Sequence, residues 1–577
     1  HNILGSVRCE SRTGSILHPE KQRVDSIRKT FRTSEIIATV LANRKIQHLD
    51  SANLFFNPSL DMLHDPFLMQ DMDKAVERVL KNIKSGKPIM VFGDYDVDGT
   101  TGAASLFCAF QKFGADVSYY IPDRAEEGYG LSFQGIDVAK DNNINLIITC
   151  DCGINAFEQV DYANDKNVDI IITDHHTTDI TLPNAFAVLN PKRKDCNYPF
   201  KGLCGGGVAF KLITAIGNEL NIPLTDYEEI LPFITLGTAA DIVPIKDENR
   251  AIVYYGLSML NQLKKPGLKT LLELAGLKGN ITVGQLVFSV APRINAAGRL
   301  GDANRAVELL VTDDVHRARI LSKELDEENK RRQFIQQTVV DEALLKVNAE
   351  ADLKNEHALI LANEGWHHGV VGIVASRIKE EFSRPTIIIA LENGVGKGSA
   401  RSIPGFDLYE ALSACQQHLS GYGGHPMAAG LTVSSNKLGG FKKAFIRIAN
   451  EQLTKEDLQP KLILDSEISL QDITPRFMGF LDKLSPYGPG NMRPKFAIRN
   501  VDIDGAPKVI GKTGEHLRFK IKQGLKSFQA VGFGLSSKYE LLITGQPVDI
   551  ACVVETNEWQ GNTTIQLNVR DIKRAKT

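Results

Sequence analysis

The chain has 577 residues, of which 43% are hydrophobic and 24% charged, and its formal net charge is −2. This length exceeds one hydrophobic core and predicts about three to five domains. The near-neutral charge excludes a histone-like binder but leaves room for a local basic groove, and no apolar run reaches the roughly 18 residues of a membrane helix. We expect a globular, cytoplasmic, monomeric protein without membrane contact.

The cysteines show no C-x-x-C spacing, which argues against a zinc or iron–sulfur site. Free, partly buried thiols in a reducing compartment are the expected state. The eight residues are Cys9, Cys108, Cys150, Cys152, Cys196, Cys204, Cys415 and Cys552.

Residues 20–85 have a helical pattern and are basic in their first half. Two interpretations are open, a nucleic-acid patch and an ordinary solvated helix face, and the second is the commoner origin of such a pattern. The basic residues are Lys21, Arg23, Arg28, Lys29, Arg32, Arg44 and Lys45.

From residue 87 the chain alternates short apolar runs with helical stretches, a rhythm that predicts a parallel sheet built from βαβ units. The expected strands are residues 89–93, 117–121, 145–150, 169–173 and 185–189.

The first of these runs ends in VFGDYDVDGTT, which places Asp94, Asp96 and Asp98 at alternate positions. Three like charges so close together repel one another, and a divalent cation is the simplest way to hold them beside a buried strand. Gly99 allows a tight turn into a helix expected to reach about residue 113. The alternative is an aspartate-rich surface turn.

Other acidic and imidazole groups follow later strands. Asp151 ends NLIITCD, IIITDHH brings Asp174, His175 and His176, and LGTAAD carries Asp241. In open parallel sheets ligands bind outside the carboxyl ends of the strands, so these groups should share one crevice. Carboxylates with one or two imidazoles suit two Mn²⁺ or Mg²⁺ ions, although each motif alone has an ordinary structural explanation.

These motifs resemble the DHH phosphoesterase superfamily, with DYDVDG, DCG, DHH and GTAAD as its four motifs. GGHPMAAG at 423–430 and GSARS at 398–402 resemble the DHHA1 domain that accompanies this core. PRINAAGR at 292–299, WHHGVVG at 366–372, PYGPGN at 486–491 and a β-rich C-terminal part are similar to the superfamily's exonucleases for single-stranded DNA.

The resemblance implies a role for each motif residue. His176 would lie near the scissile phosphate and Asp94 close to the ions. Cys150, Cys152 and Ala400 depart from the family pattern without removing a ligand, and the two cysteines would tune the surroundings of the metal. The implied metal ligands are Asp96, Asp98, Asp151, His175 and Asp241.

Residues 312–347 contain no proline or glycine and carry one apolar stripe, which predicts a long helix connecting two lobes; a pair of helices is the alternative. Strands at 357–363 and 384–394 should flank a helix that contains Arg377. A turn at 394–402 would then present Ser399 and Arg401 to a terminal phosphate, and the resemblance places His425 opposite the metals.

Arg293, Asn295 and Arg299 form a donor-rich segment at the end of the first lobe. They either cap a helix or contact the phosphate backbone, and the paired arginines favour the backbone contact.

From about residue 460 short strands of period two predict a small barrel of the OB type. In HLRFKIK, at 516–522, one face is apolar and the other carries Arg518, Lys520 and Lys522, a surface suited to a nucleic-acid backbone. Tyr487, Phe528 and Trp559 are candidates for base stacking, and the alternative is a solvated basic face on a structural module.

The sequence therefore predicts an α/β protein with an N-terminal helical segment (1–60), a DHH domain (61–311), a connecting helix (312–350), a DHHA1 domain (351–458) and an OB-like barrel (459–577). The resemblance implies a two-metal phosphodiesterase that degrades single-stranded DNA from 5′ to 3′ and releases 5′-mononucleotides in repair and recombination, with single-strand-binding protein and a helicase as candidate partners. No organic cofactor is expected. The alternatives are a phosphodiesterase for short oligonucleotides or cyclic dinucleotides, a pyrophosphatase and a non-catalytic replication scaffold.

Overall fold

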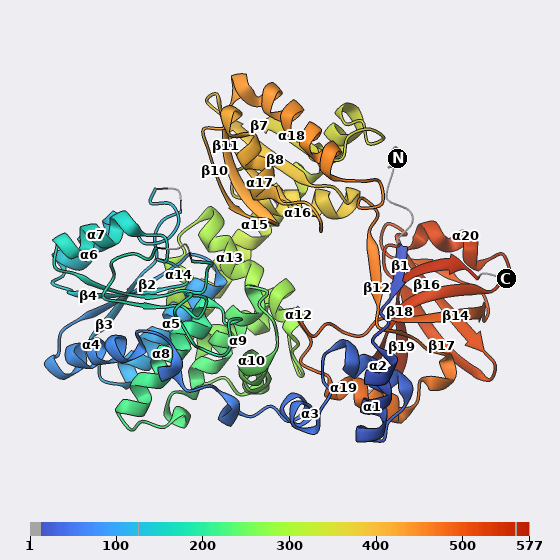
Figure 1. Ribbon diagram of the computed structural model, residues 1–577, viewed down its shortest axis with the longest axis horizontal. Helices are drawn as coiled ribbons and strands as arrows, with labels where there is room; N and C mark the ends of the chain where they lie inside the picture. The colour runs from blue at the N-terminus through green and yellow to red at the C-terminus, as the bar shows by residue number, and fades with distance from the viewer. Residues whose placement is uncertain (1–12, 125, 179–180, 560–561, 576–577) are drawn as a thin grey trace. The chain divides into compact units, whose positions relative to one another are not determined.

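The structure is a computed structural model that describes residues 13–124, 126–178, 181–559 and 562–575 (Figure 1). The chain forms two compact units. Of the described residues, the first unit contains those within 21–329 and 479–493, and the second those within 13–20, 330–478 and 494–575. None of the described helices is long and apolar enough to cross a bilayer.

A five-stranded parallel sheet in the order β3-β2-β4-β5-β6 forms the centre of the first unit. Its inner strands are apolar along their whole length because helices cover both faces. All five strands predicted from the sequence are confirmed to within two residues. They are β2 (Ile89–Gly93), β3 (Val117–Tyr120), β4 (Leu146–Cys150), β5 (Asp169–Thr173) and β6 (Ala187–Leu189).

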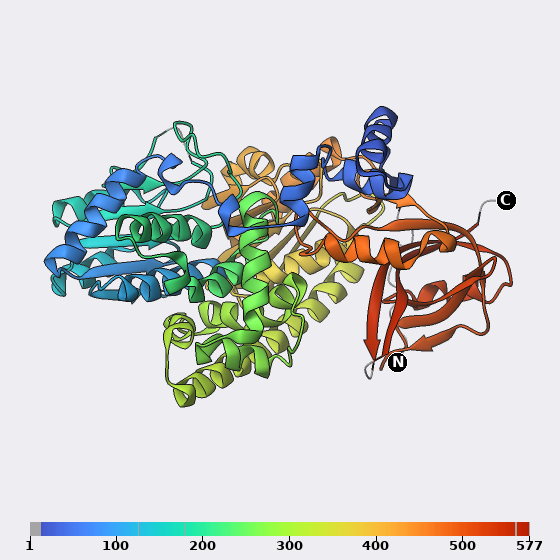
Figure 2. The ribbon, with the colours of Figure 1, turned by 90° about the horizontal axis from the view of Figure 1, so that it is seen from below.

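Two separate cores lie on the faces of this sheet. Val91 packs into the core formed with α4, α5 and α8, whereas Phe92 points to the core with α6 and α7. Figure 1 shows α6 and α7 above the strands and α4 and α8 below them, and Figure 2 views the sheet from the side of α4 and α8. The helices of the two cores are α4 (Met72–Ser85), α5 (Val97–Lys112), α6 (Phe133–Asp141), α7 (Phe157–Asp165) and α8 (Gly205–Glu219).

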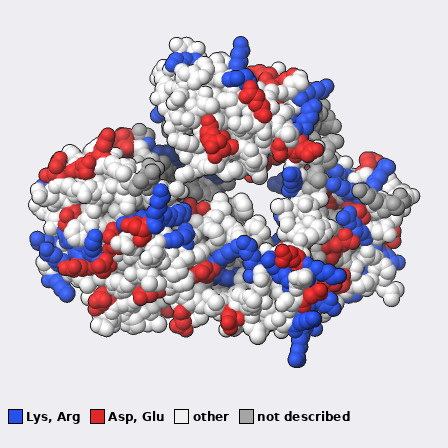
Figure 3. Space-filling view, viewed as in Figure 1, with Lys and Arg blue, Asp and Glu red and all other residues white. Residues whose placement is uncertain are grey.

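The remainder of the first unit is helical, as predicted for its N-terminal part. Lysine and arginine side chains gather over α1 (Figure 3). Arg44, by contrast, is a structural residue, because its guanidinium donates to Asn491 and to the Met492 carbonyl. The helices are α1 (Lys21–Phe31), α2 (Glu35–Asn43), α3 (Leu49–Phe56), α9 (Leu231–Ala240), α10 (Asp247–Met259), α11 (Pro266–Leu274), α12 (Val283–Gln285), α13 (Ala291–Leu300) and α14 (Asn304–Val311).

Helix α15 (Val315–Glu350) runs without a break from the first unit into the second, so the predicted connecting helix is confirmed and the alternative of a helix pair is wrong. Leu321 and Leu325 near its start pack into the first-unit core, and Val340 and Val347 near its end pack into a core of the second unit. A single apolar stripe thus serves two cores.

The second unit begins with a mixed sheet in the order β10-β11-β9-β8-β7, in which α16 connects the parallel pair β7 and β8. Residues 395–401 form strand β9, bonded to β8 and β11, so the predicted turn around GSARS is wrong. The glycines in this segment give β9 room for close packing instead of turning the chain. The elements are β7 (Leu359–Glu364), α16 (Val371–Phe382), β8 (Thr386–Glu392), β9 (Val395–Arg401), α17 (Leu408–Ala414), β10 (Gly421–His425), β11 (Ala428–Ser434) and α18 (Leu438–Gln452).

The C-terminal strands form one seven-stranded sheet that β14 closes by pairing with β16 as well as β18, which gives the predicted barrel. A separate parallel pair joins β1 (Thr13–Ile16) to β12 (Lys461–Leu464). The barrel elements are β13 (Ser466–Glu467), α19 (Pro475–Lys483), β14 (Phe496–Ile503), β15 (Lys508–Ile510), β16 (His516–Gln523), β17 (Lys526–Gly532), α20 (Tyr539–Leu542), β18 (Val548–Trp559) and β19 (Asn562–Arg574).

A buried ion pair anchors helix α8 in the first unit. The Lys211 ammonium lies 3.0 Å from Glu248 Oε2 and also donates to the His64 carbonyl. The second Glu248 oxygen accepts the Tyr198 hydroxyl at 2.6 Å. Both charged side chains have zero exposure, so each depends on the other for its solvation.

We expect Lys211→Met to lower the free energy of unfolding of the first unit by about 3–5 kcal/mol, because it leaves the Glu248 carboxylate buried without its cation. Lys211→Met combined with Glu248→Leu should recover much of this loss. Lys112→Met, which breaks a half-exposed pair with Glu229, should cost less than about 1 kcal/mol. Denaturant titration followed by hydrogen exchange in α8 measures these differences, and equal losses for the two lysines would contradict the argument.

Candidate metal centre

Three neighbouring strands of the first-unit sheet deliver carboxylates to one edge. Asp94 directly follows β2, Asp151 directly follows β4, and Asp174 directly follows β5. Their backbone N–H groups continue the sheet, since Asp94 donates to the Cys150 carbonyl and Asp151 to the Thr173 carbonyl. The side chains therefore start one strand spacing apart, as expected for the carboxyl edge of a parallel sheet.

Helix termini bring two more carboxylates to this edge. Asp96 caps α5 and accepts the Gly99 N–H at 3.1 Å. Asp98, which is buried, accepts the N–H groups of Gly205 at 2.6 Å and Gly206 at 3.0 Å from the first turn of α8. A Cβ at Gly205 would lie 2.4 Å from the Asp151 Cβ, so only glycine permits this approach. The positive end of α8 thus stabilises a buried anion.

Asp241 completes the set from the end of α9. One of its carboxylate oxygens lies 3.5 Å from His175 Nε2, and Asp151 Oδ1 lies 3.2 Å from the same nitrogen. The backbone at this edge is strained, because Asp151 and the exposed Ile242 both adopt a left-handed conformation with φ 62°. Such strain in a β-branched residue beside a ligand is typical of functional sites.

The predicted residues fall into three overlapping groups whose ligand atoms lie within 4.8 Å of one another. Asp151 and His175 each belong to two groups. The structure therefore brings together all five predicted metal ligands with Asp94 and His176. The groups are Asp94–Asp96–Asp151, Asp98–His175–Asp241 and Asp151–His175–His176.

A cation fits the electrostatics of this cluster. Asp94 Oδ1, Asp151 Oδ1 and both ring nitrogens of His175 are buried without a hydrogen-bond partner among the described residues. Burial, followed by repulsion from neighbouring carboxylates, raises the pKa of Asp94 and that of Asp151 well above the usual value. The same two causes raise the pKa of Asp241 to about 8. These oxygens gain their full charge only beside a compensating positive ion.

The donor types indicate which cation. Burial lowers the pKa of His175 to about 4, so its ring is neutral and able to ligate near pH 7. Burial also raises the pKa of the Cys150, Cys152 and Cys204 thiols, which keeps them protonated and unsuited as ligands. A set of carboxylates with imidazole and no thiolate suits Mn²⁺ or Mg²⁺.

The second unit contains the predicted phosphate-binding pair on β9. Arg401 is half-buried, and Nη1 donates to Ser399 Oγ at 2.9 Å and to the Ala400 carbonyl. Among the described residues Arg401 has no carboxylate partner, and burial lowers the pKa of its guanidinium. A Cβ at Gly372, in the first turn of α16, would lie 3.1 Å from both side chains. A helix N-terminus, a hydroxyl and an unneutralised guanidinium thus converge on one place, which suits an anion.

The other predicted contacts have varied surroundings. Arg293 pairs with Asp326 at 2.9 Å, and Asn295 Oδ1 accepts the Val97 N–H at 3.2 Å, so both also have structural roles in the first unit. Arg299, on α13, lies in the same unit. In the second unit Arg377 is exposed on α16, and the exposed His425 ends β10.

The predicted alternation in β16 is confirmed. Leu517, Phe519 and Ile521 are buried, whereas Arg518, Lys520 and Lys522 are exposed on the opposite face. Arg518 and Lys520 line a hollow of about 620 Å³ on the barrel, in which Lys520 pairs with Asp504 at 2.8 Å. The side chain of Trp559 lies outside the described residues.

Three family models match successive parts of the chain. They are the DHH family N-terminal domain at residues 88–238, the DHHA1 domain at 355–451 and the RecJ OB domain at 464–571.

Curated relatives match across these domains. The single-stranded-DNA-specific exonuclease RecJ of Bacillus subtilis strain 168 is 37% identical over 564 residues, which cover 96% of this chain and 70% of that protein. The protein of the same name from Escherichia coli K12 is 35% identical over 529 residues, 87% of this chain and 90% of that protein. The chain belongs to the RecJ family.

Solved structures agree with this assignment. RecJ of Thermus thermophilus in complex with Mn²⁺ matches 98% of this chain and 80% of its own chain, with a TM-score of 0.83 at 29% identity. The same protein in complex with Mg²⁺ gives a TM-score of 0.78 at 28% identity over 98% of this chain and 79% of its own. The RecJ-family fold, an α/β core with DHH and DHHA1 domains and an OB-type barrel, is therefore that of this chain.

Two further residues contribute to this RecJ-family site: Asp174, which the sequence places in the crevice without a specific role, and Tyr129, which it does not indicate. Asp174 Oδ1 accepts His176 Nδ1 at 2.8 Å and the His175 N–H at 2.7 Å, and its second oxygen accepts the Ile154 N–H. Burial alone would lower the pKa of His176 and raise that of Asp174. The hydrogen bond and charge attraction between them outweigh it, so the pKa of His176 is raised and that of Asp174 is lowered. The Tyr129 ring lies edge-on to His176, with its hydroxyl 3.3 Å from the Asp151 carbonyl. The position of Asp174 after a predicted strand could have indicated its role at the site. Tyr129 lies in a loop, and no sequence pattern marks it as part of the site.

The carboxylates make stability depend on pH and metal. The folded pKa of Asp241 is about 8 against an ordinary 3.8, so the folded protein binds more protons than the unfolded chain in that interval. In EDTA the thermal midpoint of the first unit should therefore fall as the pH rises toward about 8. Mn²⁺ should oppose the fall, because ligation requires deprotonated carboxylates.

Asp151→Asn provides the matched variant for this measurement. It removes one buried charge, so it should raise the midpoint in EDTA near pH 8 and abolish the increase caused by Mn²⁺. Thermal unfolding at a series of pH values measures both effects, and a flat profile in EDTA would contradict the explanation.

Proposed function

We propose that this chain is a divalent-metal-dependent exonuclease that degrades single-stranded DNA from its 5′ end and releases 5′-mononucleotides. The observation that carries the proposal is the buried cluster of Asp96, Asp98, Asp151, His175 and Asp241. The names of the relatives in Bacillus subtilis and Escherichia coli support the substrate. The 5′ to 3′ polarity comes from the family resemblance.

We assign two cations to the cluster, because it gathers five carboxylates and the His175 imidazole, more donors than one ion takes. These residues would hold the ions, which would polarise the phosphodiester, lower the pKa of water and neutralise the leaving oxygen. The chain's own contribution is to hold the ligand oxygens fixed. Asp98 is held by two N–H groups of α8, and Asp96 by the Gly99 N–H.

His176 is the proposed group that stabilises charge on the phosphate. Its Nδ1 faces Asp174, which fixes the ring and leaves Nε2 for the substrate. The raised pKa favours the imidazolium form, a better donor to a phosphate oxygen than the neutral ring. Asp94 belongs to the ligand group of Asp96 and Asp151, and we assign it an orienting role there. His425, from the second unit, is a further candidate donor to the phosphate.

The remaining assignments concern binding. Ser399 and Arg401 would bind the 5′ phosphate, because a half-buried guanidinium without a carboxylate partner among the described residues favours an anion. Arg518, Lys520 and Lys522 on the barrel would follow the strand's backbone. Arg293, Asn295, Arg299 and Arg377 stay predicted backbone contacts.

Digestion of end-labelled DNA tests the function. With Mn²⁺ or Mg²⁺ we expect stepwise release of mononucleotides from the 5′ end of single strands and little from duplexes, and Asp96→Ala or His175→Ala should reduce the rate at least about a hundredfold. Rapid cleavage confined to short oligonucleotides, cyclic dinucleotides or pyrophosphate would replace the proposal, and a wild type without metal-dependent activity would favour a scaffold.

The same assay tests the assignment of Ser399 and Arg401 as the 5′-phosphate contacts. Arg401→Gln should raise KM about tenfold for 5′-phosphorylated strands and abolish the preference over unphosphorylated ends. Lys397→Gln, on the same strand, removes an exposed cation and should leave this preference intact.

The barrel offers a separate measurement. Asp504 pairs with Lys520 and accepts the Ser527 hydroxyl, so it places a negative charge in the hollow proposed for DNA. Asp504→Asn should therefore tighten single-strand binding about threefold and increase the salt dependence by about one counterion. Glu540→Gln removes the same charge from exposed α20 and should change neither quantity. Weaker binding by Asp504→Asn would show that the aspartate orders the binding surface instead of competing with phosphate.

A further inference from the structure

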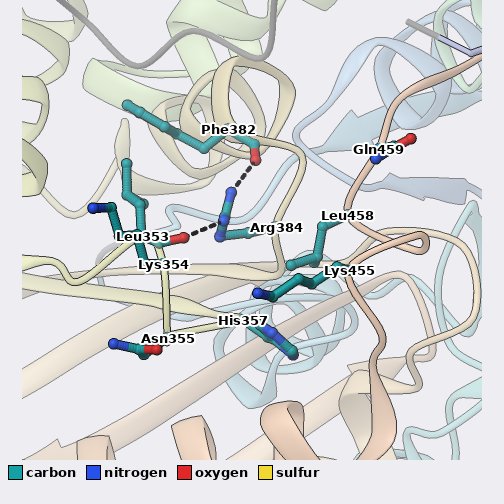
Figure 4. A pocket seen from close by; sticks show the side chains of 9 residues that line it. All are labelled: Leu353, Lys354, Asn355, His357, Phe382, Arg384, Lys455, Leu458 and Gln459. Atoms are coloured by element: carbon teal, nitrogen blue, oxygen red, sulfur yellow. Dashed lines mark hydrogen bonds between the residues drawn. The ribbon is translucent and has the colours of Figure 1, made fainter. Parts of the chain in front are cut away.

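A hollow of about 540 Å³ in the second unit has no assigned role (Figure 4). It lies where β7 and β8 begin, and three separate segments line it. These are the loop between α15 and β7, the turn between α16 and β8, and the segment after α18. Its size is within the range of small-ligand sites in proteins.

The lining is cationic. It includes Lys354, Arg384, Lys455 and the imidazole of His357, and none of the described lining residues is acidic. The carboxylate of Asp352 nearby is held in a local turn by the Lys354 N–H and the Asn355 amide. Asp457 is likewise held by the backbone and hydroxyl of Thr454. Lys354 also interacts electrostatically with Asp352, whereas no described acid pairs with Lys455. The Lys455 ammonium is therefore open to an anion.

One cation of the set has a structural role. The Arg384 guanidinium donates to the carbonyls of Leu353, Glu356 and Phe382, and so fixes two of the lining segments against each other. Figure 4 shows two of these bonds. Because these two segments are already held in place before a ligand binds, the protein loses less conformational entropy on binding.

Two side chains remain for a ligand. His357 Nδ1 donates to the Leu453 carbonyl at 2.9 Å, which leaves Nε2 available. In the neutral ring Nε2 accepts from a ligand hydroxyl, and in the imidazolium form it donates to a phosphate oxygen. Lys455 is exposed and has no hydrogen bond or ion pair within the described chain, and in Figure 4 its ammonium extends toward Arg384 and His357. An ammonium beside an imidazole suits a phosphate monoester.

The hollow also has an apolar side and a defined place on the sheet. Leu458 and Phe382 are buried in its wall, which suits a sugar or a base edge. Thr386, two residues after Arg384, pairs with Arg401 at the end of β9. The hollow and the proposed 5′-phosphate contacts on β9 thus lie at the same end of the sheet, where β8 begins and β9 ends.

We propose that this hollow binds a nucleoside 5′-monophosphate, with the phosphate between Lys455 and His357 and the nucleoside against Leu458. The preference for an anion rests on the charges and contacts of the hollow. The choice of a mononucleotide rests in addition on the proposed function, because that reaction releases this class of molecule. Product would then be retained at a second place on the enzyme.

Hydrogen exchange on the full chain in EDTA tests the site with thymidine 5′-monophosphate as the probe. We expect protection of residues 353–358 and 382–385, and no protection by thymidine, which lacks the phosphate. Lys455→Glu should raise the half-saturating concentration at least about tenfold. Lys443→Glu, an exposed lysine of α18 outside the hollow, should change it less than about twofold.

Further arms separate this site from its rivals. The Arg401→Gln variant should keep the protection of residues 353–358. If Arg401→Gln abolished this protection while Lys455→Glu left it unchanged, the proposal would be overturned. Equal binding of inorganic phosphate, or protection only by oligothymidylate, would also overturn it. The binding is measured without catalysis, so a chain that fails to digest DNA but still shows the protection would refute the proposed function and leave this site standing.

Discussion

The structure of the first unit depends on one electrostatic constraint, the gathering of several carboxylates in a place with little water. Asp94, Asp98 and Asp151 are at most 2% exposed, and two of them have oxygens without a partner among the described residues. Charges in such a place repel one another and lose their hydration, which is why their pKa values rise. A divalent cation removes both penalties, so folding and ion binding are coupled here.

The rest of the fold serves this constraint. Three parallel strands place carboxylates one strand apart, and the glycine-rich start of α8 brings N–H groups to Asp98. The strained backbone at Asp151 is tolerated because it directly follows the buried apolar strand β4. The buried Lys211–Glu248 pair also anchors α8, so a second electrostatic contact holds the helix whose first turn stabilises Asp98.

Much of this was predictable because the signals are local. A buried parallel strand is an uninterrupted apolar run, and the residue after it lies at the ligand edge, so strands and metal residues follow from the sequence. Strand β9 was mistaken for a turn because its glycines serve close packing between two strands. The Arg293–Asp326 pair and the β1–β12 pairing join residues far apart in the chain, and no local pattern indicates such contacts.

The two units have opposite electrostatic deficits. The first buries carboxylates that lack a cation, and the second holds the half-buried Arg401 without a carboxylate partner among the described residues. A protein that needed these groups only for stability would pair them internally, since an unpaired buried charge costs several kcal/mol, on the order of 3–5. Divalent cations would answer the first deficit, and an anion such as the proposed terminal phosphate would answer the second. The charges that destabilise the isolated chain would thus be those that select its ligands.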